Sequence, residues 1–318
     1  MSNLTDLLPA GAGGKQVSFV ASGTIGNGVT VGLNSDGTVT AVGESSYSQS
    51  VGSETTYDAI GGQYSQVVGI GGSKFTIAYR GNDDDIFTVI GTMSGTTLTF
   101  GTSVLTFDTS QTTEDPVIAY DASSGKVVVS CSFNYGEDAL CVVGTVSGTS
   151  ITFGSSVNFH SGNDVRYLAM VYDSINQKIV IGYSNKSVGT SGYAVVGTVS
   201  GTSISFGTPV QFASANSQYI RGTFDPDQGS VLFTFRDDGN SNYPTAIVGQ
   251  VSGTSISFGT EVVMYSDSGS SYGAPATYDS SAQKIVVTYT AGSDLERIQA
   301  GTISGTSVSF GSAQELNS

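Results

Sequence analysis

Carboxylates and tyrosines are the side chains of this sequence best suited to chemistry, and they gather in short polar loops. A carboxylate supplies hydrogen-bond acceptors, whereas a tyrosine ring supplies an apolar face with a polar hydroxyl at its tip. This combination is typical of glycan or receptor contact, which we predict for the following residues: Tyr135, Asp138, Asp164, Asp237, Asp238, Tyr243 and Tyr272. Tyr219 lies beside the same loops. The alternative interpretation is a solvated acidic rim that keeps the protein soluble.

The densest run of carboxylates consists of Asp83, Asp84 and Asp85. Calcium takes about six to eight oxygen ligands, so this run is a possible cation site. The run lacks the D-x-D-x-D-G pattern of a calcium loop, and an exposed loop is the other interpretation. We therefore predict no cofactor, with calcium as the one candidate.

Nucleophilic and general-base catalysis have few candidate residues in this chain. His160 is the single histidine and has no recognisable partners, so we expect it on the surface. Cys131 and Cys141 occupy positions where other repeats have aromatic residues or alanine, which indicates packing, although a cross-strand bridge between them is conceivable. We predict no catalytic residues and a protein that is not an enzyme.

The charge balance narrows the range of partners. Eleven Lys and Arg stand against 26 Asp and Glu, a formal net charge of −15, which argues against nucleic-acid binding. No run approaches the roughly 18 apolar residues of a membrane span, so we predict no membrane insertion. The first residues also lack the features of a secretory signal.

Internal repeats provide the elements that must position the polar loops. The unit GTxSGTxxxFG, or a close variant, recurs every 52 or 53 residues and starts at Gly91, Gly144, Gly197, Gly249 and Gly301. One repeat resolves into strand A (167–173), strand B (178–184), strand C (192–200) and strand D (204–212). A repeat of about 50 residues that consists only of strands is typical of a β-propeller blade.

We predict an all-β fold, a β-propeller of four-stranded blades over 15–318. The expected blades cover approximately 15–60, 63–107, 115–160, 166–212, 218–264 and 272–316. The first is degenerate: VGSETTY (51–57) fits the register of FGTPVQF (206–212), and 29–43 fits a B–C hairpin. The alternative is five blades preceded by a separate β-adaptor at 15–62.

The loop lengths separate the two ends of the blades. The A–B and C–D turns have constant length, whereas the B–C and D–A loops vary and should emerge together at one end, where we expect any binding site. Four of the A–B turns begin with an aspartate, namely Asp121, Asp173, Asp225 and Asp279. We predict an Asx-type turn there, with the lysines that follow discouraging sheet-to-sheet pairing.

Residues 1–14 precede the repeats and have a different character. Leu4, Leu7, Leu8 and Pro9 form a short apolar patch ahead of a Gly-Ala-Gly-Gly hinge. An apolar peptide tethered to a rigid domain is suited to docking on a partner. A disordered terminus is the alternative interpretation.

The pattern NLTDLLPAGAGGKQVSFVASGTIGNGVTVGLNSDGTVTAVG and the tandem VVGTVSGTSISFGTPV units resemble repeat proteins of marine tailed bacteriophages, including cyanophages. The similarity covers nearly the whole chain. It implies a non-enzymatic virion component of the tail-fibre, appendage or head-decoration type, assembled in the host cytoplasm. Residues 1–14 would dock it to other virion proteins, and its acidic loop face would point outward. The alternative function is a lectin-like propeller that binds a glycan or receptor, such as a host-surface glycan.

Overall fold

The computed structural model describes residues 31–34, 38–41, 53–57, 62–82, 84–108, 116–132, 139–160, 165–186, 189–266, 272–291 and 295–316. The chain divides into two compact units, Met1–Val51 and Gly52–Ser318. In the first unit, β1 (Val31–Leu33) pairs antiparallel with β2 (Val39–Ala41), which agrees with the hairpin predicted over 29–43. In the described part of the chain no helix is long and apolar enough to cross a membrane.

The described residues of the second unit form five antiparallel blades, each named here by its innermost strand. The β3 blade comprises β3 (Gln63–Gly71), β4 (Lys74–Arg80), β5 (Ile86–Ser94), β6 (Thr97–Phe100) and β7 (Val104–Phe107). The β8 blade comprises β8 (Val117–Asp121), β9 (Lys126–Ser132), β10 (Ala139–Ser147), β11 (Ser150–Phe153) and β12 (Val157–His160). The β13 blade comprises β13 (Val165–Asp173), β14 (Lys178–Asn185), β15 (Ser191–Ser200), β16 (Ser203–Phe206) and the start of β17 (Val210–Asp225). The β17 blade comprises the end of β17, β18 (Ser230–Asp237), β19 (Tyr243–Ser252), β20 (Ser255–Phe258) and β21 (Val262–Val263). The β22 blade comprises β22 (Ala276–Asp279), β23 (Lys284–Ala291), β24 (Leu295–Ser304), β25 (Ser307–Phe310) and β26 (Gln314–Glu315).

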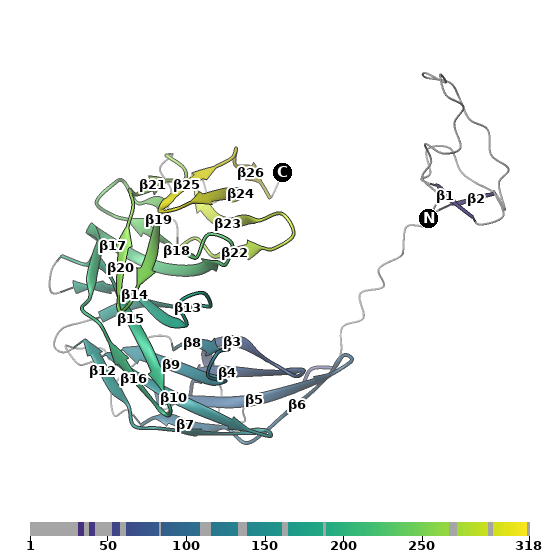
Figure 1. The fold of residues 1–318 in the computed structure, drawn as a ribbon, viewed down its shortest axis with the longest axis vertical. Helices are drawn as coiled ribbons and strands as arrows, with labels where there is room; N and C mark the ends of the chain where they lie inside the picture. Colours follow the sequence, from purple (N-terminus) through teal and green to yellow (C-terminus); the bar gives the residue numbers. More distant parts are fainter. Residues whose placement is uncertain are drawn as a thin grey trace. The chain divides into compact units, whose positions relative to one another are not determined.

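The five blades follow one another in chain order, with their innermost strands in contact (Figure 1). β3 contacts β8, β8 contacts β13, β13 contacts β17, and β17 contacts β22. The 16-residue strand β17 belongs to two blades, because its start pairs with β15 and its end with β18. The fourth strand of each blade is divided into two segments that pair with the same third strand, as β6 and β7 both pair with β5. Meanders of this kind, repeated around inner strands, define a β-propeller, so the predicted fold class is confirmed.

The predicted tail (1–14) lies outside the described residues, as does most of the predicted first blade (15–60). The choice between six blades and five blades with an adaptor therefore stays a prediction. One part of the first-blade register can be compared directly. The ring of Tyr57 packs against Tyr79 (5.2 Å between centroids) and Phe100 (5.8 Å) of the β3 blade.

Phe212 at the end of its strand D makes the same pair of contacts in the next blade, with Phe235 (5.6 Å) and Phe258 (5.4 Å). The predicted alignment of 51–57 with 206–212 places Tyr57 at the position of Phe212. The structure agrees with this alignment, since both rings contact corresponding residues of the blade that follows.

The A–B turns have the predicted Asx geometry. Asp173 Oδ1 accepts hydrogen bonds from the backbone N–H groups of Ile175 (3.0 Å) and Asn176 (2.9 Å), and the other three aspartates make equivalent pairs of bonds. These bonds satisfy turn amides that the sheet leaves unpaired, which explains the aspartate in these four blades. In the β8 blade burial opposes ionisation, but hydrogen bonds from Ser124 and Ser123 lower the pKa of Asp121 below its usual value.

The glycine of each FG pair locks neighbouring blades together. A Cβ on Gly154 would lie 2.0 Å from the carbonyl oxygen of Thr202 in the next blade, and Gly101, Gly207 and Gly259 show the same approach. Only a residue without a side chain permits this contact. Gly311 of the β22 blade differs, because the nearest described atom, Ala300 O, is 3.7 Å from the Cβ position.

Cys131 on β9 and Cys141 on β10 are both fully buried, and both are free thiols. Burial raises the pKa of each thiol far above its ordinary value. They pack as small apolar side chains, as predicted, and no bridge joins them. His160 is half-buried rather than surface-exposed, with its ring 5.4 Å from that of Tyr183.

Candidate ligand-binding site

The B–C and D–A connections meet at one end of the blades, as the loop lengths predict. The backbone N–H of Asp238, in a B–C loop, donates to Asn216 O in the D–A connection (2.9 Å). The N–H of Ser217 likewise donates to Thr190 O (2.8 Å). We call this the loop end of the propeller, and the candidate site is built here.

Three tyrosines at the loop end occupy equivalent positions on three inner strands. Tyr64 on β3, Tyr167 on β13 and Tyr219 on β17 each lie where the pairing register shifts, and they have φ angles of 48°, 54° and 53°. A positive φ is unusual for a bulky residue and costs about 1–3 kcal/mol, so it is tolerated mainly where function needs it. A β-bulge is the device that re-aims a side chain in this way. Gly273 (φ 95°) precedes β22 at the corresponding position.

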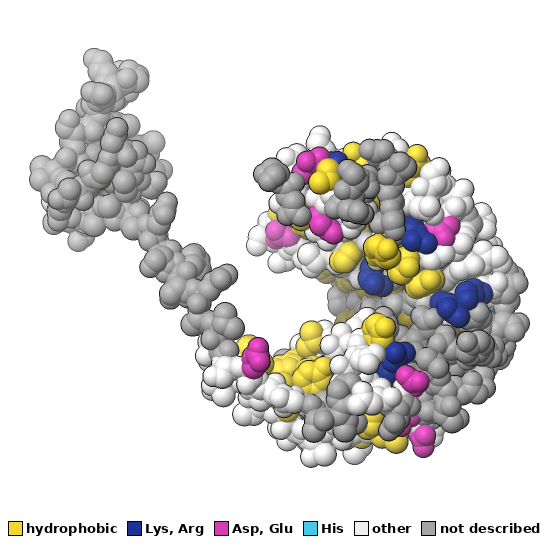
Figure 2. Space-filling view, turned by 180° about the vertical axis from the view of Figure 1, so that it is seen from behind, with side chains coloured by type: hydrophobic (Ala, Val, Ile, Leu, Met, Phe, Trp, Pro, Cys, Tyr) yellow, Lys and Arg dark blue, Asp and Glu magenta, His cyan; other side chains and the backbone are white. Residues whose placement is uncertain are grey.

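The three tyrosines line one cavity of about 280 Å³. Its lining is completed by Ser65, Gln66, Leu168 and Arg221. A second cavity of about 180 Å³ shares Gln66, Leu168 and Arg221, and its further lining residues are Ala169, Met170, Gly222, Pro275 and Ala276. Figure 2 shows hydrophobic side chains and Lys or Arg side chains together around the hollow of this unit. The two cavities form a central channel with an aromatic outer part.

A row of aromatic rings extends from the channel to the surface. The rings of Tyr167 and Tyr219 are 4.9 Å apart at 48°, and those of Tyr219 and Tyr272 are 5.6 Å apart at 70°. Tyr272 is 67% exposed. The predicted contact residue Tyr272 therefore belongs to the same aromatic group as the cavity tyrosines.

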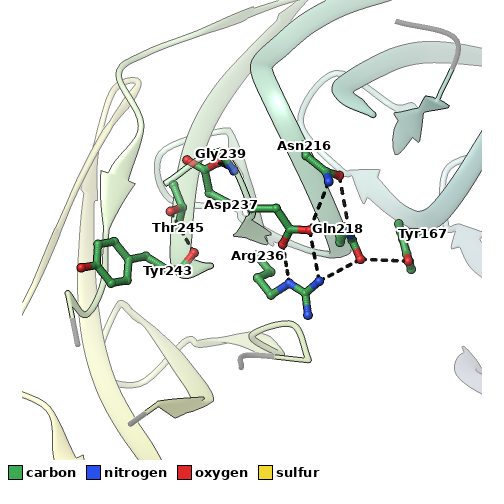
Figure 3. A network of polar contacts seen from close by, with 9 residues as sticks. Tyr167, Asn216, Gln218, Arg236, Asp237, Gly239, Tyr243 and Thr245 are labelled. Carbon is green, nitrogen blue, oxygen red and sulfur yellow. Dashed lines mark hydrogen bonds and ion pairs between the residues drawn. The ribbon is translucent and has the colours of Figure 1, made fainter. Parts of the chain in front are cut away.

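Arg236, near the end of β18, belongs to a polar network that reaches Tyr167 of this group (Figure 3). Its guanidinium carbon lies 4.9 Å from the ring centroid of Tyr219, and its Nη2 donates to Gln218 Oε1 (3.0 Å). Tyr167 donates its hydroxyl proton to the same oxygen (3.0 Å). Asp238 completes the network by pairing with Arg236 Nε at 2.5 Å. Although partial burial opposes ionisation, the hydrogen bond and charge of Asp238 raise the pKa of Arg236.

The other predicted contact residues on this loop have different surroundings. Asp237 is only 5% exposed, and its Oδ1 accepts the N–H of Gly239 (3.0 Å), so it shapes the turn. Burial raises the pKa of Asp237. Asp238 is engaged by Arg236, Asn216 and Gln218. The ring of Tyr243 points away from the network in Figure 3.

The carboxylate run predicted as a cation site is only partly described. Asp84 lies in a left-handed conformation (φ 65°) and pairs with Arg80 at 3.6 Å, while Asp85 is half-buried. Among the residues that the structure describes, no group of three or more His, Cys, Asp or Glu is arranged to hold a metal. The following predicted site residues lie outside the described residues: Leu4, Leu7, Leu8, Pro9, Asp83, Tyr135, Asp138 and Asp164.

Sequence reasoning missed Tyr64, Tyr167 and the arginines of the loop end. Arg80, Arg221 and Arg236 lie on strands rather than in the polar loops, and the ends of these strands reach the same region. A repeat alignment contains the missing signal. A tyrosine stands two residues before Gln66, Ala169 and Arg221, and these three residues occupy the same place in the pairing of strand A with strand B.

No family model and no curated protein sequence matches the chain. Among solved structures, a protein of unknown function from Dyadobacter fermentans superposes with a TM-score of 0.54 at 14% identity, covering 75% of this chain and 78% of that one. The SapL1 lectin in complex with α-methyl fucoside superposes with a TM-score of 0.51 at 12% identity, covering 79% and 80%. A lectin from Aleuria aurantia with a six-bladed β-propeller fold gives 0.48 at 12% identity, covering 76% and 73%. The first two likenesses indicate a shared fold.

Proposed function

We propose that this protein is a carbohydrate-binding β-propeller without catalytic activity, and that a sugar binds in the tyrosine-lined cavity at the loop end. One observation carries the proposal. Three tyrosines from three blades take the same strained backbone conformation, and all three line one cavity. The repeated cost of that conformation is explained if the rings serve a common ligand.

The chemistry of the cavity suits a sugar. Tyrosine rings offer apolar faces for the C–H groups of a pyranose, and their hydroxyls can exchange hydrogen bonds with its hydroxyls. Ser65, Gln66 and Arg221 add donors and acceptors to the same lining. The described residues of this lining include no carboxylate, histidine or cysteine, so they offer contacts rather than acid–base groups.

The shared fold supports the proposal in a general way. The SapL1 lectin, which superposes on most of this chain, is described in complex with α-methyl fucoside. A propeller of this architecture can therefore carry a sugar site. The identity of 12% transfers no individual residue, so the proposal depends on the tyrosines.

A glycan array followed by calorimetric titration of the best ligand tests the proposal. We expect Tyr167→Ala and Tyr219→Ala each to weaken binding at least about fivefold, since stacking on an aromatic ring contributes roughly 1 kcal/mol or more. Tyr278→Ala is the matched control, because Tyr278 lies on β22 at the opposite end and bonds with Asp227. A protein that binds no glycan, or variants that bind as well as the wild type, would refute the proposal.

The virion location is a second proposal, and its support is the resemblance to marine phage repeat proteins. On a particle, the propeller would contact host-surface glycans, while residues 1–14 would dock to other virion proteins. Deletion of residues 1–14 should then abolish incorporation into particles without changing sugar binding. Normal incorporation of the shortened chain would contradict the docking role.

A further inference from the structure

The inner strands place a second layer of side chains beyond the tyrosines. Gln66, Ala169, Arg221 and Pro275 come from four blades. Each of the first three follows the tyrosine of its bulge by two positions, and Pro275 follows Gly273 by two positions. The first three pair with Ala78, Gly182 and Thr234, which are equivalent positions of strand B, and Pro275 O accepts the N–H of Thr288 at the corresponding place. All four line the second cavity. Four of the five described blades therefore contribute one residue each at this level.

Arg221 is the charged residue of this layer. It lines both cavities, and among the described lining residues of either cavity no other residue is charged. Its side chain is half-buried, and Nη1 donates to the neighbouring Ile220 O (3.0 Å). Gln66, which also lines both cavities, adds an amide beside it.

The positive charge of Arg221 in this channel contrasts with the negative net charge of the chain. The formal net charge is −15, yet the centre of the propeller holds an arginine between tyrosines. The repulsion of an anion by distant surface carboxylates is screened beyond about 8 Å at physiological salt. Among the described lining residues, Arg221 is the one that offers an anionic group a full positive charge.

We propose that the channel selects a sugar that carries a carboxylate, such as a uronic acid. The carboxylate meets the guanidinium of Arg221 and the amide of Gln66, while the sugar ring lies against the tyrosines. Arginine suits this task because its planar fork donates two parallel hydrogen bonds to a carboxylate. The inference rests on the proposed carbohydrate-binding function and specifies the class of sugar.

Two pairs of sugars test the inference by calorimetry on the full chain in 0.15 M salt. Methyl glucuronide is compared with methyl glucoside, and methyl galacturonide with methyl galactoside, so that each pair differs in the carboxylate alone. We expect at least one acidic sugar to bind about tenfold or more tightly than its neutral partner. Arg221→Gln should remove that preference, so that the ratio of the affinities for the acidic and the neutral sugar falls to about one.

Lys126→Gln is the matched control for loss of one positive charge. Lys126 donates to Thr145 Oγ1 (2.7 Å) at the A–B end, and its replacement should leave the preference unchanged. If Arg221→Gln does not fold, Arg221→Lys serves instead, with a reduced preference expected because the second parallel hydrogen bond is lost.

The outcomes separate the two proposals. Equal affinity for acidic and neutral sugars, or a preference that survives Arg221→Gln, would overturn the inference while leaving sugar binding intact. Binding of neutral sugars alone would have the same meaning. No binding to any of the four sugars or to a glycan array would overturn the inference and the proposed function together.

Discussion

The guanidinium of Arg236 lies over the ring of Tyr219, with 4.9 Å between its central carbon and the ring centroid. Arg80 lies over Tyr64 in the same way at 4.6 Å. Both arginines end strand B of their blade, and both tyrosines lie in the bulge of the adjoining strand A. Two blades thus use the same pair of positions to fix an aromatic ring at the channel.

Arg236→Ala should lower both stability and ligand affinity. The change removes the contact with Tyr219 and the hydrogen bonds to Gln218 and Asp238, which together are worth about 1–3 kcal/mol. Tyr219 then loses its fixed orientation, and we expect several-fold weaker sugar binding. Thermal unfolding and calorimetry measure the two effects.

Arg297→Ala is the matched control for this prediction. Arg297 lies 4.4 Å from the ring centroid of Tyr265 and pairs with Glu315 at 3.0 Å, but it lines neither cavity. Its loss should reduce stability without weakening binding. Equal losses of affinity in both variants would show that Arg236 has no specific role in the site.

Gly154→Ala should destabilise the propeller, because its new Cβ would overlap the carbonyl oxygen of Thr202. Backbone atoms must shift to relieve the overlap, which costs about 1–3 kcal/mol. Gly311→Ala changes the same sequence motif in the β22 blade, where the nearest described atom is 3.7 Å away. Chemical denaturation of both variants provides the test, and an equal loss of stability would contradict the proposed blade contact.

Asp121→Ala should cost about 1–2 kcal/mol at pH 7, since two turn amides lose their acceptor. The pKa of Asp121 is lowered in the folded state, so its contribution is present above the unfolded value of about 3.9 and is lost as pH falls through the folded value. Unfolding curves of wild type and variant should therefore converge in acid. A constant difference across that range would mean that the charged carboxylate is not the stabilising form.

Asp237→Asn should have the opposite pH dependence. Burial raises the folded pKa of Asp237, so the folded state favours the protonated carboxyl and wild-type stability falls as pH rises through that value. Asparagine keeps an acceptor for the Gly239 amide but carries no charge. The variant should be more stable than the wild type at pH 7 and should lose this advantage below about pH 3.9. A variant less stable than the wild type at pH 7 would contradict this assignment.

Much of the fold could be predicted from the sequence because the same pattern of strands and turns recurs in every repeat. The aspartates of four A–B turns and the glycines of the SGT and FG units have fixed spacing, and both have local physical causes that the structure confirms. The candidate site was less accessible. The bulges that turn Tyr64, Tyr167 and Tyr219 into one cavity depend on φ angles, which residue type does not reveal for tyrosine. Asp238 was predicted to contact a ligand because it is a carboxylate in a loop, but in the structure it pairs with Arg236.

Because Cys131 and Cys141 are buried, the rate at which their thiols react reports on local opening of the blade that contains them. A thiol reagent attacks the thiolate, and neither sulfur is accessible or readily ionised while β9 and β10 remain paired. The rate of labelling in native buffer therefore counts how often this one blade opens. Since the sequence holds two cysteines in all, the signal comes from a single place and needs no introduced probe.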